Sequence, residues 1–204
     1  KLYEKASFPL KPKGTLRKRS INPAYVRHLR RHLHLKHPIK AVIDASNGTQ
    51  GIPAALLFRN NRQIKIINKR PDGRFPSHAP NPLKRGSKKD AREAIIKHKA
   101  AFGAILDGDG DRIVVLDEHG VAIPSDVLCA LIASHNVTHG SILLDLRTSR
   151  AVIEHLRKKH IRVIKNRVGS VHYKRRIIHN KIYLGGELSG HIMFHENHAI
   201  DDSL

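Results

Sequence analysis

The sequence predicts an α/β fold, with two similar three-layer α/β domains whose sheets are mixed and mostly parallel. After residue 21, short runs of Val, Ile and Leu alternate with segments of helical periodicity. This alternation is typical of strands joined by helices. The chain has 204 residues, enough for two small domains that each have a core. A boundary near 123–125 divides the alternation into two parts.

In the first part, residues 22–124, apolar spacing and turn residues predict the elements. Asn22 is the expected N-cap of a helix, because Pro23 suits the first helical position. The apolar run before the Asn47-Gly48 turn predicts a buried strand. In order, we expect a helix at 22–37, a strand at 39–46, a helix at 52–60, a strand at 63–68, an irregular loop at 69–87, a helix at 88–101, and strands at 102–107 and 112–117.

The second part, residues 125–204, repeats this pattern. Ser125 is expected to cap one helix, and Thr148 or Ser149 to start the next. In order, we expect a helix at 125–137, a strand at 141–145, a helix from 148 or 149 to 159, a strand at 161–166, a helix at 171–179, and a strand at 181–188 that enters a glycine loop.

Residues 1–21 are expected to form a basic linker or leader, because they combine Lys and Arg with Pro and Gly. No stretch approaches the roughly 18 apolar residues of a membrane span, and the start has no apolar core of signal-peptide length. We therefore expect no membrane partner. The single cysteine, Cys129, rules out an internal disulfide and suits a reducing compartment, so we expect a cytoplasmic location.

The chain is strongly basic, with 38 Lys and Arg against 17 Asp and Glu and a formal net charge of +21. These basic residues are spread from Lys1 to Lys181, whereas stacking aromatics are few and tryptophan is absent. A positive field also attracts small phosphorylated molecules. A basic nucleic-acid-binding protein is therefore an alternative that the sequence does not favour.

Against this background, "DGDGDR" at 107–112 concentrates three carboxylates. One interpretation is a solvated glycine-rich turn. An EF-hand loop is another, with acids at positions one, three and five and Glu118 at twelve, but Arg112 occupies position six, which requires glycine. The third is a Mg²⁺ site, because alternating glycines let Asp107, Asp109 and Asp111 converge on one ion. Arg112 could then hold a phosphate oxygen.

The acidic segment resembles the metal-binding loop of the α-D-phosphohexomutase family, the phosphomannomutases and phosphoglucomutases. Three further segments resemble the same family in the same order: "AVIDASNGTQG", "PDGRFPSHAPNPL" and "LGGELSGHIMF". The resemblance runs from about residue 39 to residue 204. It identifies the chain as the second domain, 22–124, and a C-terminally truncated third domain, 125–204, of a four-domain enzyme.

The resemblance implies a Mg²⁺-dependent isomerase of carbohydrate metabolism that interconverts hexose 1-phosphate and hexose 6-phosphate through a hexose 1,6-bisphosphate. A phosphoserine on another domain would carry the phosphoryl group, so this chain alone is expected to be inactive. By matching position, Asp107, Asp109 and Asp111 would be the metal ligands, and Arg112 would lie near the phosphoserine or substrate. The implied sugar-binding residues are Glu187, Ser189 and His191.

Two positions depart from the family pattern. Arg147 stands where many members have a lysine that is a candidate proton shuttle; because arginine stays protonated, we expect Arg147 to clamp or polarise instead. Ser170 stands where the family often has a histidine. The segment "IASHN" resembles the family's nucleophile loop, but it follows the metal loop and has helical spacing, so we expect Ser134 to be structural.

Three alternatives remain open from the sequence. The parent enzyme could be a phosphoglucosamine mutase, although Leu188 stands where those enzymes usually have glutamine. The chain alone could be a non-catalytic phosphosugar-binding fragment, whereas the enzyme interpretation requires the remaining domains of the parent as partners. The third is the nucleic-acid-binding protein considered above.

Overall fold

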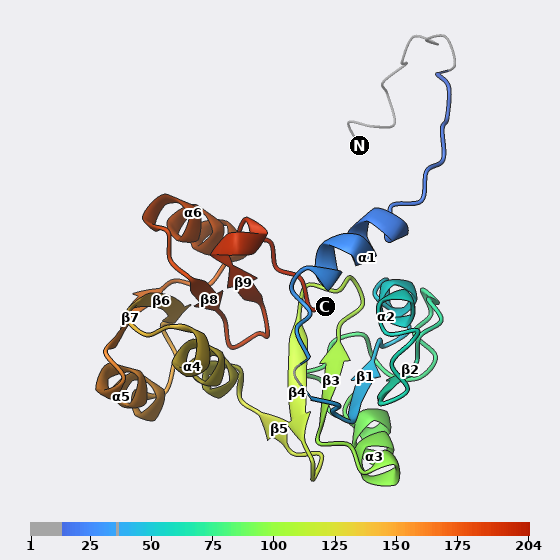
Figure 1. Cartoon of the computed structure of the whole chain (residues 1–204), viewed down its shortest axis with the longest axis horizontal. Helices are drawn as coiled ribbons and strands as arrows, with labels where there is room; N and C mark the ends of the chain where they lie inside the picture. The colour runs from blue at the N-terminus through green and yellow to red at the C-terminus, as the bar shows by residue number, and fades with distance from the viewer. Residues whose placement is uncertain (1–13, 36) are drawn as a thin grey trace, which may run out of the picture.

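The computed structural model describes residues 14–35 and 37–204, which form two α/β units side by side (Figure 1). Residues 1–13 of the predicted leader lie outside the described residues, and residues 14–20 have neither helix nor strand. Among the helices of the described ranges, none is both long and apolar enough to cross a membrane.

The first unit is built on a sheet with the strand order β2-β1-β3-β4-β5. β1 pairs in parallel with β2 and β3, whereas β3–β4 and β4–β5 are antiparallel, so this sheet is evenly mixed. Its elements are α1 (Asn22–Arg30), β1 (Ala41–Asp44), α2 (Gly51–Leu57), β2 (Ile64–Ile67), α3 (Lys89–His98), β3 (Phe102–Leu106), β4 (Ile113–Asp117) and β5 (Ala122–Ile123).

The core of this unit lies mainly between the sheet and α3. Ala91 and Ile95 of α3 are fully buried in the same cluster as Val42, Ile105 and Leu116 of the strands. Burying a Val, Leu or Ile side chain of this kind stabilises the fold by about 1.5–3 kcal/mol. On α1 and α2, a smaller buried cluster joins Val26, Leu29 and Leu57. This packing fixes the ends of β1 and β3, where the candidate site lies.

The second unit has the strand order β7-β6-β8-β9 and is mostly parallel, since only the β8–β9 pair is antiparallel. Its elements are α4 (Ser125–Asn136), β6 (Gly140–Asp145), α5 (Arg150–Lys158), β7 (Ile161–Asn166), α6 (Ser170–Asn180), β8 (Leu184–Gly186), β9 (Ile192–Phe194) and a 3₁₀ turn (His195–Asn197).

Alternation along β6 shows the three layers of this unit. Ile142 and Leu144 point into the cluster that contains α4 and α5 residues, whereas Leu143 lies in the cluster with Tyr173 and Ile177 of α6. Successive side chains of a strand point to opposite faces, so α6 covers the face opposite α4 and α5. The predicted α/β fold class with mixed sheets is therefore confirmed.

Several predicted boundaries were wrong, mainly where helices end. The first helix stops at Arg30 instead of residue 37, and its N-cap is Ile21, so the prediction of Asn22 as the cap was wrong. The helix at 125–136 is preceded by Pro124 as its N-cap, so Ser125 is its first helical residue. The prediction for Ser149 is confirmed, because its side chain accepts the N–H of Val152 at 3.3 Å.

The strand predicted at 181–188 is only three residues long, and the short strands β5 and β9 were not predicted. Two of the three residues of β8 are glycines, and both lie at close contacts. A side chain at Gly185 would meet Ile177 at 2.5 Å, and one at Gly186 would meet the sulfur of Cys129 at 2.2 Å. The two glycines therefore let α6 and α4 approach β8 closely.

Candidate functional site

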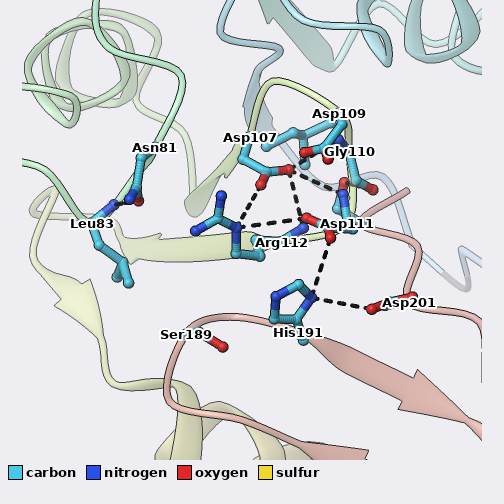
Figure 2. A network of polar contacts seen from close by, with 12 residues as sticks. Asn81, Leu83, Asp107, Asp109, Gly110, Asp111, Arg112, Ser189, His191 and Asp201 are labelled. Atoms are coloured by element: carbon cyan, nitrogen blue, oxygen red, sulfur yellow. Dashed lines mark hydrogen bonds and ion pairs between the residues drawn. The ribbon is translucent and has the colours of Figure 1, made fainter. Parts of the chain in front are cut away.

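The acidic loop 107–112 connects the end of β3 to the start of β4. Asp107 is fully buried, and its Oδ1 accepts the backbone N–H groups of Gly110, Asp111 and Arg112 at 2.9, 3.0 and 3.1 Å (Figure 2). Its Oδ2 accepts the Arg112 Nε–H at 2.6 Å. Gly110 has φ +85°, a conformation that glycine tolerates readily. One carboxylate therefore holds the whole turn.

The other two acids of the loop converge on Asp107. Asp107, Asp109 and Asp111 can each offer an oxygen such that these atoms lie within 4.8 Å of one another. The Oδ1 of Asp111 is buried and accepts no hydrogen bond among the described residues, and its ion-pair partner, Arg112 Nε, lies 3.6 Å away. A buried carboxylate oxygen without a hydrogen bond, beside two more carboxylates, fits a cation with a preference for hard oxygen ligands, such as Mg²⁺.

The ionisation of Asp107 and Asp111 differs because their partners differ. Burial opposes the charge of Asp107, but the hydrogen bonds from Arg112 and its positive charge outweigh burial and lower the pKa. Burial raises the pKa of Asp111 to about 6, and the neighbouring Asp107 carboxylate adds to this shift. Without a cation, the loop therefore favours a neutral Asp111 below about pH 6.

This raised pKa predicts how stability depends on pH in a chelator. The folded pKa of Asp111 lies above its ordinary value of 3.8, so its contribution is present below about pH 4 and lost as pH rises through about 6. Asp111→Asn should flatten this dependence and raise the free energy of unfolding at pH 7 by about 1 kcal/mol, a value reduced for solvent exposure. Urea denaturation from pH 4 to 7 measures it, with Glu118→Gln as the control for removing an acid. An unchanged pH profile in Asp111→Asn would contradict the assignment.

The turn after β1 is hydrogen-bonded to the acidic loop and to the residue before it. Ser46 and Asn47 have φ of +50° and +53°, and the Ser46 hydroxyl donates to the Leu106 carbonyl at 2.5 Å. Thr49 donates its backbone N–H to the Gly108 carbonyl at 3.0 Å and its hydroxyl to the Asp109 carbonyl at 3.0 Å. The segment "SNGT" therefore determines where the acidic loop lies.

The predicted sugar-binding residues lie on the loop 187–191 between β8 and β9. Glu187 is only 4% exposed. Its Oε1 accepts the N–H of Gly169 at 2.8 Å, and its Oε2 accepts the Ser189 hydroxyl at 3.0 Å. The loop closes on itself, because Gly190 donates to the Glu187 carbonyl and Glu187 donates to the His191 carbonyl.

The two loops meet, although they belong to different sheets. The N–H of Ile113 donates to the Gly190 carbonyl at 3.0 Å. His191 Nδ1 lies 3.6 Å from Asp111 Oδ2 and 3.2 Å from Asp201 Oδ2 (Figure 2). Ser203 donates its N–H and its hydroxyl to the Gly110 carbonyl at 3.1 and 2.9 Å. The structure thus brings the acidic loop and the loop of Glu187 into one site.

Arg147 lies beside this site. Its Nε and Nη2 donate to the two oxygens of buried Asp145 at 2.9 and 2.5 Å, and these bonds lower the pKa of Asp145. Asp145 Oδ2 also accepts the Leu188 N–H at 3.4 Å, which links Arg147 to the loop after β8. The Arg147 side chain is 58% exposed.

Ser170 and Ser134 lie on helices. Ser170 is the first residue of α6, next to Gly169, whose N–H bonds Glu187. Ser134 lies in α4, and its hydroxyl is 3.2 Å from His155 Nε2 of α5. The helical position that was predicted for Ser134 is therefore confirmed.

Some residues of the site were not predicted. Asp201 contacts His191, and the backbone of Gly190 contacts Ile113. The spacing of residues along the sequence does not predict either of these contacts. The signal that could have found Gly190 is its place between two site residues, since glycine at such a position marks a positive φ.

Family models and known proteins match this chain along most of its length. Residues 23–120 match the model of phosphoglucomutase/phosphomannomutase, alpha/beta/alpha domain II, and residues 124–204 match that of alpha/beta/alpha domain III. A phosphomannomutase of Methanocaldococcus jannaschii is 35% identical over 161 residues, covering 77% of this chain and 36% of the relative. A phosphoglucomutase of Neisseria gonorrhoeae is 29% identical over 209 residues, covering all of this chain and 45% of the relative.

Solved structures give the same picture. A phosphoglucomutase/phosphomannomutase family protein from Burkholderia thailandensis superimposes with a TM-score of 0.78 at 27% identity, over 90% of this chain and 41% of that one. An Aspergillus fumigatus N-acetylphosphoglucosamine mutase, solved with GlcNAc-6P and magnesium, shares the fold with a TM-score of 0.52 at 21% identity, over 84% of this chain and 36% of that one. The chain spans less than half the length of these relatives.

Proposed function

Because the chain belongs to the phosphoglucomutase/phosphomannomutase family, we propose that it is the metal- and sugar-binding part of a phosphohexomutase. The parent enzyme would interconvert hexose 1-phosphate and hexose 6-phosphate through a hexose 1,6-bisphosphate. One observation carries the proposal: the acidic loop lies against the glycine loop, residues 187–191. The Ile113–Gly190 hydrogen bond and the His191–Asp111 contact join these two loops. We further propose 22–124 and 125–204 as the domain limits and the cytoplasm as the location.

In this proposal, Asp107, Asp109 and Asp111 hold Mg²⁺. The buried Oδ1 of Asp111, which accepts no hydrogen bond among the described residues, and the convergence of the three carboxylates support the assignment. When bound, the ion would neutralise negative charge that develops during phosphoryl transfer. Asp107 would have two tasks, because it also holds the turn through backbone N–H groups.

Arg112 is proposed to hold a phosphoryl oxygen. Its Nε donates to Asp107, which fixes the direction of the guanidinium. A fixed guanidinium stays protonated and can present its terminal N–H groups to an anion. The side chain is 27% exposed, so a ligand beside the acidic loop could reach it.

Glu187, Ser189 and His191 are proposed to bind the hexose. A carboxylate offers about four acceptor sites, and Glu187 uses two of them for Gly169 and Ser189. The remaining sites could accept sugar hydroxyls. Arg147, held by Asp145, would clamp or polarise the substrate, because arginine does not exchange protons readily near neutral pH.

The phosphoserine would come from a part of the parent protein outside this sequence, together with the remaining domains as partners. The substrates are proposed to be hexose phosphates and hexose 1,6-bisphosphate. A phosphoglucosamine mutase remains a second candidate, which the Leu188 between Glu187 and Ser189 does not favour.

Magnesium titration by calorimetry tests the metal site. We expect one weak site, which Asp109→Asn abolishes, because Asp109 is exposed and its loss removes a ligand without removing a support of the turn. Glu118→Gln is the matched control: Glu118 would be the twelfth-position ligand of an EF-hand, so this variant should bind Mg²⁺ like the wild type. Binding that survives Asp109→Asn, or that Glu118→Gln abolishes, would refute the proposed site.

A further inference from the structure

A second group of buried charges lies in the first unit, outside the acidic and glycine loops. His78 Nε2 is 3.0 Å from Asp44 Oδ2, and the two side chains are only 7% and 0% exposed. His78 Nδ1 is 2.9 Å from the Ala79 carbonyl. Both ring nitrogens thus face oxygen atoms, an arrangement that favours a proton on each nitrogen and therefore the charged imidazolium.

The surroundings favour this charged form. Asp44, at the end of β1, and Asp90, in α3, are the charged groups that face the ring, and the hydrogen bond with Asp44 raises the pKa of His78. The other oxygen of Asp44 accepts the Ser46 N–H at 2.9 Å and the Asn68 side-chain N–H at 3.0 Å. Asp44 is therefore fully hydrogen-bonded, as a buried carboxylate must be.

One path leads from this pair to the acidic loop through Ser46. Asp44 fixes the backbone of Ser46, whose φ is +50°. The Ser46 hydroxyl then donates to the carbonyl of Leu106, the residue that directly precedes Asp107. Any movement of Asp44 would reach Asp107 through these two hydrogen bonds.

A second path leads through the long loop 69–88, on which His78 lies. Phe75 and Pro80 of this loop pack on Gly108: a side chain added there would be 2.9 Å from the Pro80 Cβ and 3.2 Å from the Phe75 ring. His78 stands between these two residues in the chain. Its ion pair therefore holds the segment that covers the acidic loop on one side.

From these two paths we infer that His78 is a positioning residue: its ion pair with Asp44 fixes the loop 69–88 and the Ser46 turn, and these two hold the acidic loop in its metal-binding arrangement. The inference rests on the proposed function for the part that concerns Mg²⁺.

An alternative for Asp44, His78 and Asp90 is a second cation site, since their ligand atoms also lie within 4.8 Å of one another. The test below separates the two.

Hydrogen exchange and magnesium titration on this 204-residue chain test the inference. The amides of Gly110, Asp111 and Arg112 donate to Asp107 and report on the loop. In His78→Ala they should exchange at least 10-fold faster than in the wild type, and Mg²⁺ should bind about 10-fold more weakly. The matched control is His119→Ala, a histidine of the same unit that is 78% exposed, which should change neither value.

His78→Gln provides a variant that keeps a donor toward Asp44 and should restore part of the protection and of the affinity. A purely structural role would accelerate exchange across the whole sheet, whereas positioning predicts changes confined to 44–49, 69–88 and 105–112. Nitrogen NMR of the His78 ring at pH 7 should show a proton on both nitrogens.

The inference is overturned if loop exchange in both His78 variants equals that of His119→Ala, or if the acceleration extends over the whole sheet. A ring with a single proton, or one that binds added Zn²⁺ or Mg²⁺, would favour the cation site instead and would equally overturn it. Failure of the proposed function looks different. A wild-type chain that binds no Mg²⁺ refutes the metal site, while the exchange rates still decide the role of His78.

Discussion

Replacing Asp107 with alanine is expected to destabilise the chain more than any other change in the acidic loop, by about 3–5 kcal/mol. Three backbone N–H groups and the Arg112 guanidinium would lose their acceptor at once, and the N–H groups are partly or fully buried. Buried donors without a partner cost about 1–3 kcal/mol each. The measurement is urea denaturation in a chelator, so that no bound cation contributes to the difference.

Asp109→Ala is the matched control, because Asp109 carries the same charge in the same loop but is exposed. It should change the free energy of unfolding by no more than about 0.5 kcal/mol. Asp107→Asn should lie between the two, since the amide oxygen can still accept N–H groups while the charge is lost. Equal effects of the two alanine variants would show that Asp107 does not hold the turn.

Gly190→Ala is expected to have the second largest effect, a destabilisation of about 2–3 kcal/mol. Gly190 has φ +98°, and left-handed conformations cost residues with a side chain about 1–2 kcal/mol. A Cβ there would also lie 2.7 Å from the Ile113 carbonyl, a backbone atom that cannot rotate away. To relieve this contact, the glycine loop, residues 187–191, would have to move away from the acidic loop. This movement would weaken the Ile113–Gly190 hydrogen bond.

Gly73→Ala is the matched control, because no atom lies within 4 Å of its added Cβ. Hydrogen exchange should show faster exchange of the Ile113 amide in Gly190→Ala and no change in Gly73→Ala, and urea denaturation should give the stability difference. If the two variants are equally stable, or if the Ile113 amide stays protected, the close contact between the loops is not as tight as described.

Most of the architecture could be predicted from the sequence because strand and helix periodicities are local properties. The strand at 161–166 was predicted to the residue, since Ile161, Val163 and Ile164 form a short β-branched run. Helix ends were harder to predict. The apolar spacing that suggested a helix up to residue 37 continues past Arg30, where Leu33 instead packs beside the cluster of Val26, Leu29 and Leu57.

The candidate site was predicted only as far as its residues are neighbours in sequence. Asp107, Asp109 and Asp111 lie within five positions, so their convergence could be expected, and it stands as a geometric fact. The approach of His191 to Asp111 joins positions 80 residues apart, and the Asp44–His78 pair joins positions 34 apart. Such contacts depend on how the sheets pack, which spacing along the chain does not encode. The chemical roles of Arg112, Arg147, Glu187, Ser189 and His191 stay predictions.

The convergence of Asp107, Asp109 and Asp111 has a consequence for the energetics of the whole chain. The folded protein keeps three acids close together, and their mutual repulsion lowers the free energy of unfolding. A cation that relieves this repulsion binds the folded form but not the unfolded one. Under the proposed Mg²⁺ site, stability would rise with the logarithm of free ion concentration, by about 1.4 kcal/mol at ten times the dissociation constant. The population of unfolded chain, which is the form open to proteolysis, would then rise as the free ion concentration falls.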